Sequence, residues 1–228
     1  MPLLTCGNSD LRRDRIWTWT LPAWVVKLPD GSPFNVCPSA GECAPRCYAR
    51  KGTYRFSNVA QAHMRNLLMV LDNPAGWEEA MRTELSAKKF VGAHVRIHDG
   101  GDFFSEDYLR AWLRIIQSTP GTTFYCYTKE VKRFNNIVRP LALNNFFYVF
   151  SYGGRQDGQI VEGDRRCDVF PSEELLTAAG FHDQGASDLL AIYGPAEVGI
   201  VVNNHPGAVK SMGGKSLREL QASRHSED

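Results

Sequence analysis

The spacing of apolar residues along the chain changes repeatedly between the period of a strand and that of a helix. Apolar and polar residues alternate in residues 16–21 and 91–97, and aromatic or β-branched residues dominate the later short runs. Strands are expected at residues 16–21, 25–28, 91–97, 122–128, 146–151 and 198–202. The chain should therefore contain a sheet whose strands are spread over most of its length.

Between these strands, apolar residues recur at intervals of three and four, which is typical of one buried helix face. Ser57, Asn73, Ser105 and Ser172 stand where helix-capping residues are expected. The predicted helices cover residues 57–71, 74–85, 105–119, 129–136, 172–179 and 187–194. From about residue 90 strands and helices alternate, which favours an α/β fold with a largely parallel sheet.

The 228 residues suit a single domain with its core at about residues 16–210, a polar N-terminal segment and a charged C-terminal tail that is expected to fray. No apolar run reaches the roughly 20 residues that cross a bilayer, and no secretory leader follows the early arginines. No membrane association and a cytoplasmic location are therefore expected. The formal net charge of +1 excludes a bulk electrostatic attraction to nucleic acid, although a local basic site is compatible with it.

Polar and glycine-rich clusters follow several predicted strands. The first is His98 to Asp102, and the others cover residues 127–129, 151–154 and 203–207. In parallel sheets ligands bind beyond the carboxyl ends of the strands, so these clusters are candidate site residues. Asp99 and Asp102 are candidates for general acid–base work, and the alternative for Asp102 is a turn residue that accepts loop amides. For His98 and His205, a packed histidine is the alternative to a site role.

Three of the six cysteines lie within eleven positions, as Cys37, Cys43 and Cys47. The residues between them are turn formers, so these thiols are interpreted as metal ligands rather than as core residues. An iron–sulfur cluster with three thiolates keeps one iron open for a small molecule, whereas a zinc site needs a fourth ligand. Cys167, Cys6 or a histidine are the candidates for that fourth position, and a loop without metal is the remaining alternative.

A basic and aromatic segment follows the cysteines. Its cations are Arg46, Arg50, Lys51 and Arg55, and its aromatic residues are Tyr48, Tyr54 and Phe56. Such a mixture can bind phosphates and stack bases, which makes nucleic acid a candidate partner. The alternative is that the rings cover the metal loop and the charges are only solvated.

The cysteine loop with its Cys-Tyr-Ala run, the strand end Arg96 to Phe103 and the run Phe124 to Lys129 resemble a group of small iron–sulfur proteins of actinobacteriophages, distantly similar to radical S-adenosylmethionine enzymes. The resemblance implies a partial (β/α) barrel, related to the TIM barrel, with a [4Fe–4S] cluster on Cys37, Cys43 and Cys47. S-adenosylmethionine would bind the fourth iron. The cofactor-binding residues that it implies are Tyr48, Gly100, Gly101, Asp102 and Ser151. The cysteine spacing, C-x5-C-x3-C, differs from the usual C-x3-C-x2-C of those enzymes.

Two functions follow from these observations. The first is a phage iron–sulfur protein in the host cytoplasm, a radical-SAM-like enzyme that modifies a nucleic acid, a nucleotide or another host component. The second is a non-enzymatic iron–sulfur or zinc protein that binds nucleic acid or a host protein as a regulatory module. A fourth protein ligand, such as Cys167, distinguishes them because it leaves no open iron.

Overall fold

The structure is a computed structural model that describes residues 2–202 and 206–225. The chain divides into two compact units. The first unit comprises residues 1–38, 48–126 and 133–147, and the second comprises residues 39–47, 127–132 and 148–228. Each unit has strands and helices of its own.

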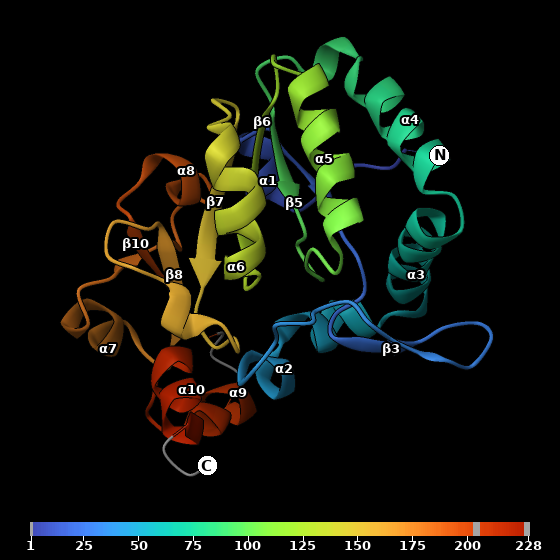
Figure 1. Cartoon of the computed structure of the whole chain (residues 1–228). Helices are drawn as coiled ribbons and strands as arrows, with labels where there is room; N and C mark the ends of the chain where they lie inside the picture. Colours follow the sequence, from blue (N-terminus) through green and yellow to red (C-terminus); the bar gives the residue numbers. More distant parts are fainter. Residues whose placement is uncertain (1, 203–205, 226–228) are drawn as a thin grey trace. The chain divides into compact units, whose positions relative to one another are not determined.

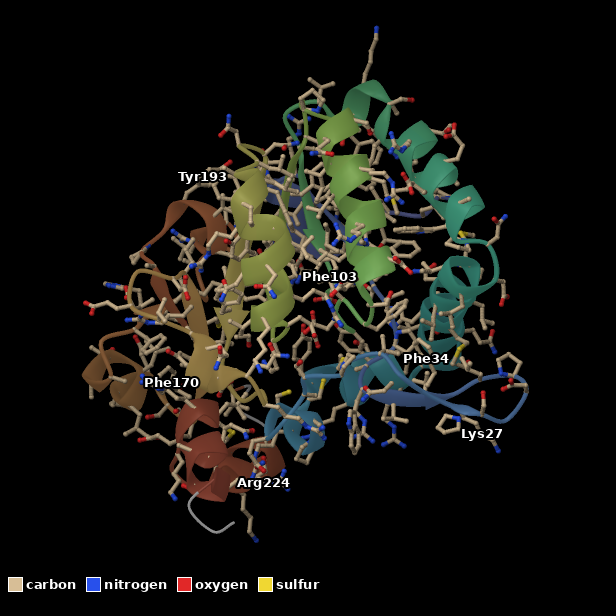
Figure 2. All side chains as sticks on the ribbon, viewed as in Figure 1. Lys27, Phe34, Phe103, Phe170, Tyr193 and Arg224 are labelled. Atoms are coloured by element: carbon tan, nitrogen blue, oxygen red, sulfur yellow. The ribbon has the colours of Figure 1, made fainter. Side chains whose placement is uncertain are left out.

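The first unit is built on strands β1 (Thr5–Cys6), β2 (Ile16–Trp19), β5 (His94–Ile97) and most of β6 (Thr123–Thr128). Strand β1 is antiparallel to β2, and β2, β5 and β6 are mutually parallel neighbours. A separate antiparallel hairpin joins β3 (Val25–Lys27) to β4 (Pro33–Asn35). Its Phe34 is labelled in Figure 2 and packs edge-on against Phe104, with the ring centroids 5.2 Å apart.

The helices of the first unit are α1 (Ser9–Arg13), α3 (Ser57–Asp72), α4 (Pro74–Leu85) and α5 (Glu106–Ser118). Two of them, α4 and α5, begin at the expected capping residues Asn73 and Ser105. Ser57, by contrast, is the first residue of its helix, and Phe56 stands at the N-cap position without a side-chain hydrogen bond. The side chain of Asn73 accepts a hydrogen bond from Gly76 N, and Ser105 accepts one from Tyr108 N. Short helical turns fill the connections: η1 (Tyr48–Arg50), η2 (Gly52–Arg55), η3 (Lys88–Phe90), η4 (Phe134–Val138) and η5 (Arg139–Leu141).

Aromatic residues form the centre of this unit. Trp77 of α4 lies between Trp19 of β2 and Trp112 of α5, with ring centroids 5.8 and 5.3 Å away. Trp19 Nε1 donates to the hydroxyl of Tyr108 at 2.9 Å, so the indole keeps a polar partner inside the core. Helices α4 and α5, which carry Trp77 and Trp112, run side by side (Figure 1).

The second unit contains most of β7 (Phe146–Ser151), together with β8 (Arg166–Phe170), β10 (Glu197–Val201) and β9 (His182–Asp183), and each neighbouring pair is parallel. Its helices are α2 (Cys43–Arg46), α6 (Val131–Arg133), α7 (Glu173–Ala178), α8 (Leu190–Tyr193), α9 (Pro206–Met212) and α10 (Leu217–His225), with the short turn η6 (Asp157–Gln159). Helix α10 packs on β8 (Figure 1). In the core of the second unit, Phe170 and Phe181 pack together with Leu176 and Tyr152.

The strands follow the order β1-β2-β5-β6-β7-β8-β10-β9, so the predicted α/β class with a mostly parallel sheet is confirmed. No pairing between β1 and β9 occurs in the described part of the chain, and the partial barrel stays a prediction. Strand β8 was not predicted. The charged C-terminal tail, expected to fray, forms α10 instead, because Leu217 is buried and Ser216 caps the helix start. His205 lies outside the described residues.

Candidate functional site

The cysteine loop passes from one unit to the other. Cys37 belongs to the first unit, and its Sγ accepts a hydrogen bond from Trp24 N at 3.3 Å. Cys43 and Cys47 belong to the second unit, at the start and the C-cap of the one-turn helix α2. All three are half-buried, and no disulfide forms among the cysteines of the described chain. They are therefore neither buried core residues nor cross-links.

Backbone hydrogen bonds fix the part of the loop that lies in the second unit. Gly41 N and Cys43 N both donate to Gly153 O, at 3.2 and 3.1 Å. Ser39 N donates to the buried Glu130 carboxylate at 2.9 Å. These bonds hold the loop on the turn that follows β7.

Arg46 is part of the same support. Its guanidinium pairs with Glu42 and donates to Ser211 O at 2.8 Å. Arg224 (labelled in Figure 2) also reaches Glu42, with 2.7 Å between Nε and Oε1. Glu42 is 7% exposed, so two cations compensate a nearly buried carboxylate. The structure thus gives Arg46 a partner within the protein, whereas Arg50, Lys51 and Arg55 are exposed in the first unit.

The donor chemistry and the donor geometry give different answers about a metal. Three thiols suit zinc or an iron–sulfur cluster. Among the described residues, however, no group of three or more His, Cys, Asp and Glu side chains is placed to hold a metal ion. Cys167, the candidate fourth ligand, lies in β8 at 1% exposure, and its thiol donates to Asp168 O at 3.7 Å. A metal-binding arrangement of these residues is therefore not displayed.

The Asp99 carboxylate, at the end of β5, is the centre of a polar cluster. The hydroxyls of Tyr48 and Tyr54 both donate to it, and Tyr48 also donates to the Asp99 carbonyl. Arg96 Nη2 lies 3.4 Å from Asp99 Oδ1. Burial raises the pKa of Tyr54, and the nearby Asp99 charge raises it further. Burial lowers the pKa of the neighbouring His63, and Asp99 opposes this effect. The predicted site residues Tyr48 and Asp99 are therefore in direct contact.

His98 has the surroundings of a packed histidine. It is 3% exposed, and its Nε2 lies 2.8 Å from the hydroxyl of Tyr108. Burial lowers the pKa of His98 to about 3, so the ring is neutral. Its backbone adopts a left-handed conformation with φ of 67°, which turns the chain away from β5. His98 thus begins the turn that carries Asp99 and Asp102.

The remaining members of that turn are tightly packed. Asp102 is 6% exposed, and its Oδ1 accepts a hydrogen bond from Phe103 N at 2.8 Å, the contact of a turn residue. Gly101 has φ of +88°, and a Cβ there would lie 2.7 Å from Leu21 Cβ. A Cβ on Gly100 would lie 3.1 Å from Leu21 O. Both glycines thus have a packing reason that is independent of any ligand.

Ser151 ends β7 in the second unit and is bound by a lysine. Lys129 Nζ donates to Ser151 Oγ at 2.7 Å and to its carbonyl at 3.1 Å. The sequence pattern did not single out two nearby acids. Asp157 accepts from Gly153 N and Gly154 N at 2.8 and 2.9 Å, and Asp168 is a buried acid inside β8. The signal in the sequence that could have pointed to Asp168 is its position within the apolar run of residues 167–170.

The family is shown by comparison with known proteins. The model of the family described as "Gene product 88" matches residues 2–224. The chain belongs to this family. Among curated proteins, the Gene 88 proteins of Mycobacterium phage L5 and Mycobacterium phage D29 are 31% and 32% identical to it over 112 residues. Each match spans 46% of this chain and 46% of the relative, so the chain covers about half the length of either protein. No solved structure matches the chain at a significant level.

These matches correct one interpretation and confirm another. The resemblance to an iron–sulfur family related to radical S-adenosylmethionine enzymes was wrong, because the matching family is Gene product 88 and no family of that kind was found. That link rested on the cysteine loop, the strand end Arg96 to Phe103 and the run Phe124 to Lys129, and the cysteine spacing departs from that of the enzymes. The bacteriophage origin is confirmed by the phage relatives. In the described residues no helix has the length and apolarity needed to cross a membrane.

Proposed function

We propose that this phage protein binds a metal centre through the thiolates of Cys37, Cys43 and Cys47, and that it acts in the cytoplasm of the host cell. A [4Fe–4S] cluster is the first candidate, and zinc is the alternative metal. The observation that carries the proposal is the presence of three half-buried thiols, outside any disulfide, on eleven consecutive residues.

Chain connectivity supports convergence of the three thiols. Six residue steps separate Cys37 from Cys43, so their Cα atoms are at most about 22 Å apart. Cys43 and Cys47 flank a single helical turn. The hydrogen bond from Trp24 N to Cys37 Sγ is of the kind that stabilises a thiolate ligand. A metal centre bound by all three sulfurs would hold them together.

What the centre does depends on its fourth ligand. Three protein thiolates leave one metal position for a small molecule such as S-adenosylmethionine, which fits an enzyme acting on a nucleic acid, a nucleotide or another host component. A fourth protein ligand fits a regulatory module. One observation favours the module: Asp102, a predicted catalytic residue, is nearly buried and accepts a hydrogen bond from its own turn. The partial barrel form of the sheet belongs to the enzyme alternative.

The test is metal analysis of protein purified without oxygen. Iron, acid-labile sulfide and zinc are measured for wild type and for Cys37→Ser, Cys43→Ser and Cys47→Ser. Cys6→Ser is the matched control for a half-buried cysteine outside the loop. Cys6 was a candidate fourth ligand in the sequence, but its thiol donates to the backbone at Ile16 O, at 3.5 Å, which argues against that role. Each loop variant should lose most of the metal, and Cys6→Ser should retain it.

Cys167→Ser separates the two alternatives. Loss of metal in this variant, as in the loop variants, would support a fourth protein ligand and the regulatory module. Full retention, with an absorption spectrum that changes when S-adenosylmethionine is added, would support the open position. Wild-type protein that contains neither iron nor zinc, or loop variants that keep as much metal as Cys6→Ser, would refute the proposal.

A further inference from the structure

A strip of cations and aromatic rings covers the segment after the cysteine loop. It consists of Tyr48, Arg50, Lys51, Arg55 and Phe56, with Trp24 beside Arg50, and it lies wholly within the first unit. The residues from 48 to 56 include three cations and no acid, whereas the whole chain has 26 basic and 25 acidic residues. Positive charge is therefore concentrated in this segment of a protein whose net charge is close to zero.

Two rings of this basic strip face solvent. The exposed fraction is 49% for Tyr48 and 59% for Phe56, which is high for aromatic residues. Tyr48 is held at its polar end, because its hydroxyl donates to Asp99, and its ring packs edge-on to Tyr54 with the centroids 5.6 Å apart. A ring fixed in this way can stack on a partner with little loss of conformational entropy.

The cations are arranged for contact with phosphate and with rings. The guanidinium carbon of Arg50 lies over the Trp24 ring, 4.5 Å from its centroid, in a cation–π contact. Lys51 and Arg55 are exposed on either side of Gly52 to Tyr54. Asp99, to which the Tyr48 hydroxyl donates, lies 3.4 Å from Arg96 Nη2. Lys51 and Arg55 thus present their charges to solvent, where a phosphate can reach them.

We propose that the basic strip binds single-stranded nucleic acid, with phosphates on Arg50, Lys51 and Arg55 and unstacked bases on Phe56 and Tyr48. A cationic track with exposed rings is the usual composition of single-strand sites, since every base offers a flat face. A duplex hides its base faces, and an acidic protein segment has no flat groups for the rings. The proposal is independent of the metal centre, because it uses none of the three cysteines.

The experiment is fluorescence anisotropy with a labelled 20-nucleotide oligothymidine, the matching oligouridine, a 20-base-pair duplex and polyglutamate. Three phosphate contacts predict that affinity for a single strand falls about 20-fold between 50 and 200 mM salt. Lys51→Ala removes one contact and should reduce that fall to about sevenfold. Lys88→Ala is the control, because Lys88 is an exposed lysine of the same unit outside the strip, and it should behave as wild type.

Stacking is tested separately from charge. Phe56→Ala should weaken binding about tenfold at constant salt, whereas Phe56→Tyr should retain it. Val91→Ala is the control for loss of an exposed apolar side chain, since Val91 is 64% exposed. The replaced side chains are exposed, so each variant should fold. Circular dichroism checks this. A preference for oligothymidine or for oligouridine assigns DNA or RNA as the ligand.

Three results would overturn the proposal. The first is an absence of single-strand binding at 50 mM salt. The second is equal affinity for duplex or polyglutamate, which would reduce the strip to a general polyanion site. The third is an affinity of Phe56→Ala or a salt dependence of Lys51→Ala that matches its control.

Discussion

Asp168→Asn should stabilise the second unit at neutral pH and remove part of its pH dependence. Asp168 is 1% exposed in β8, and burial raises the pKa of its carboxyl group to about 6. Above that pH the folded protein holds a nearly buried charge, whose solvation by water has been lost. Asparagine has the same shape and carries no charge.

The magnitude follows from the difference in pKa between the folded and unfolded states. A rise from 3.8 to about 6 is about 2 pKa units, which corresponds to about 3 kcal/mol at 1.36 kcal/mol per unit. Between these pH values the folded state binds more protons than the unfolded state. The free energy of unfolding of wild type should therefore fall as pH rises from about 4 to about 6, and this contribution should be constant above that range.

Changes in the hydrogen bonds of Asp168 can make the gain in stability smaller than this value of about 3 kcal/mol. Its Oδ1 accepts from Val169 N at 2.7 Å and from Arg218 N at 3.2 Å, and an asparagine oxygen can accept both. Ser216 bonds to the carboxylate as well and would have to accept from the new amide instead. We expect a net gain of about 1–3 kcal/mol at pH 7–8 and none at pH 4.

The assay is urea unfolding at pH 4, 5, 6, 7 and 8, followed by circular dichroism and by tryptophan fluorescence. All five tryptophans lie in the first unit, so fluorescence reports on that unit alone. Glu162→Gln is the control, because Glu162 is an exposed acid of the second unit. The reasoning would be refuted if Asp168→Asn were no more stable than wild type at pH 8, or if both proteins lost stability equally between pH 4 and 6.

Three further predictions concern the first unit, each measured by urea unfolding with tryptophan fluorescence. Burial lowers the pKa of His98 to about 3, so the unfolded state binds the extra proton and stability should fall as pH decreases from about 6.5 towards 3, by up to about 5 kcal/mol in total; a flat profile would contradict this. Ser105→Ala removes the cap on Tyr108 N and should cost about 1 kcal/mol, whereas Ser105→Asn should cost less; equal stability of the two variants would argue against capping. Gly101→Ala places a Cβ 2.7 Å from Leu21 Cβ and should cost more than about 1 kcal/mol, because the strain of a side chain at positive φ adds to the clash; an unchanged midpoint would exclude both effects.

Local patterns determined most of the secondary structure. The alternation in residues 91–97 and the dense run at 122–128 correspond to β5 and β6, and Phe146–Ser151 matches β7 at both ends. Ser105 and Asn73 mark real helix starts, since each side chain accepts a hydrogen bond from the first turn. These features depend on neighbours in sequence, so periodicity and capping suffice to find them.

Strand β8 was not predicted from the sequence because its formation depends on the rest of the fold. Residues 166–170 contain a buried aspartate, which breaks the apolar run, and the strand is completed only by parallel pairing with β7 and β10. The pKa of Asp168 likewise depends on burial, and its partner Arg218 is 50 residues away in the chain. A single window of sequence holds neither fact.

The candidate site divides in the same way. By itself the sequence determined the chemistry: three thiols on one loop, a basic and aromatic segment after them, and an acid at the end of β5. The tertiary structure decided which of these meet. It brings the Tyr48 hydroxyl into contact with Asp99, which is 51 residues away in the chain. His98 and Asp102 are buried and packed, and Arg46 forms an ion pair with Glu42. Residue type sets what a side chain can bind, whereas its exposure and its partners are set by segments distant in sequence, which only the folded chain brings together.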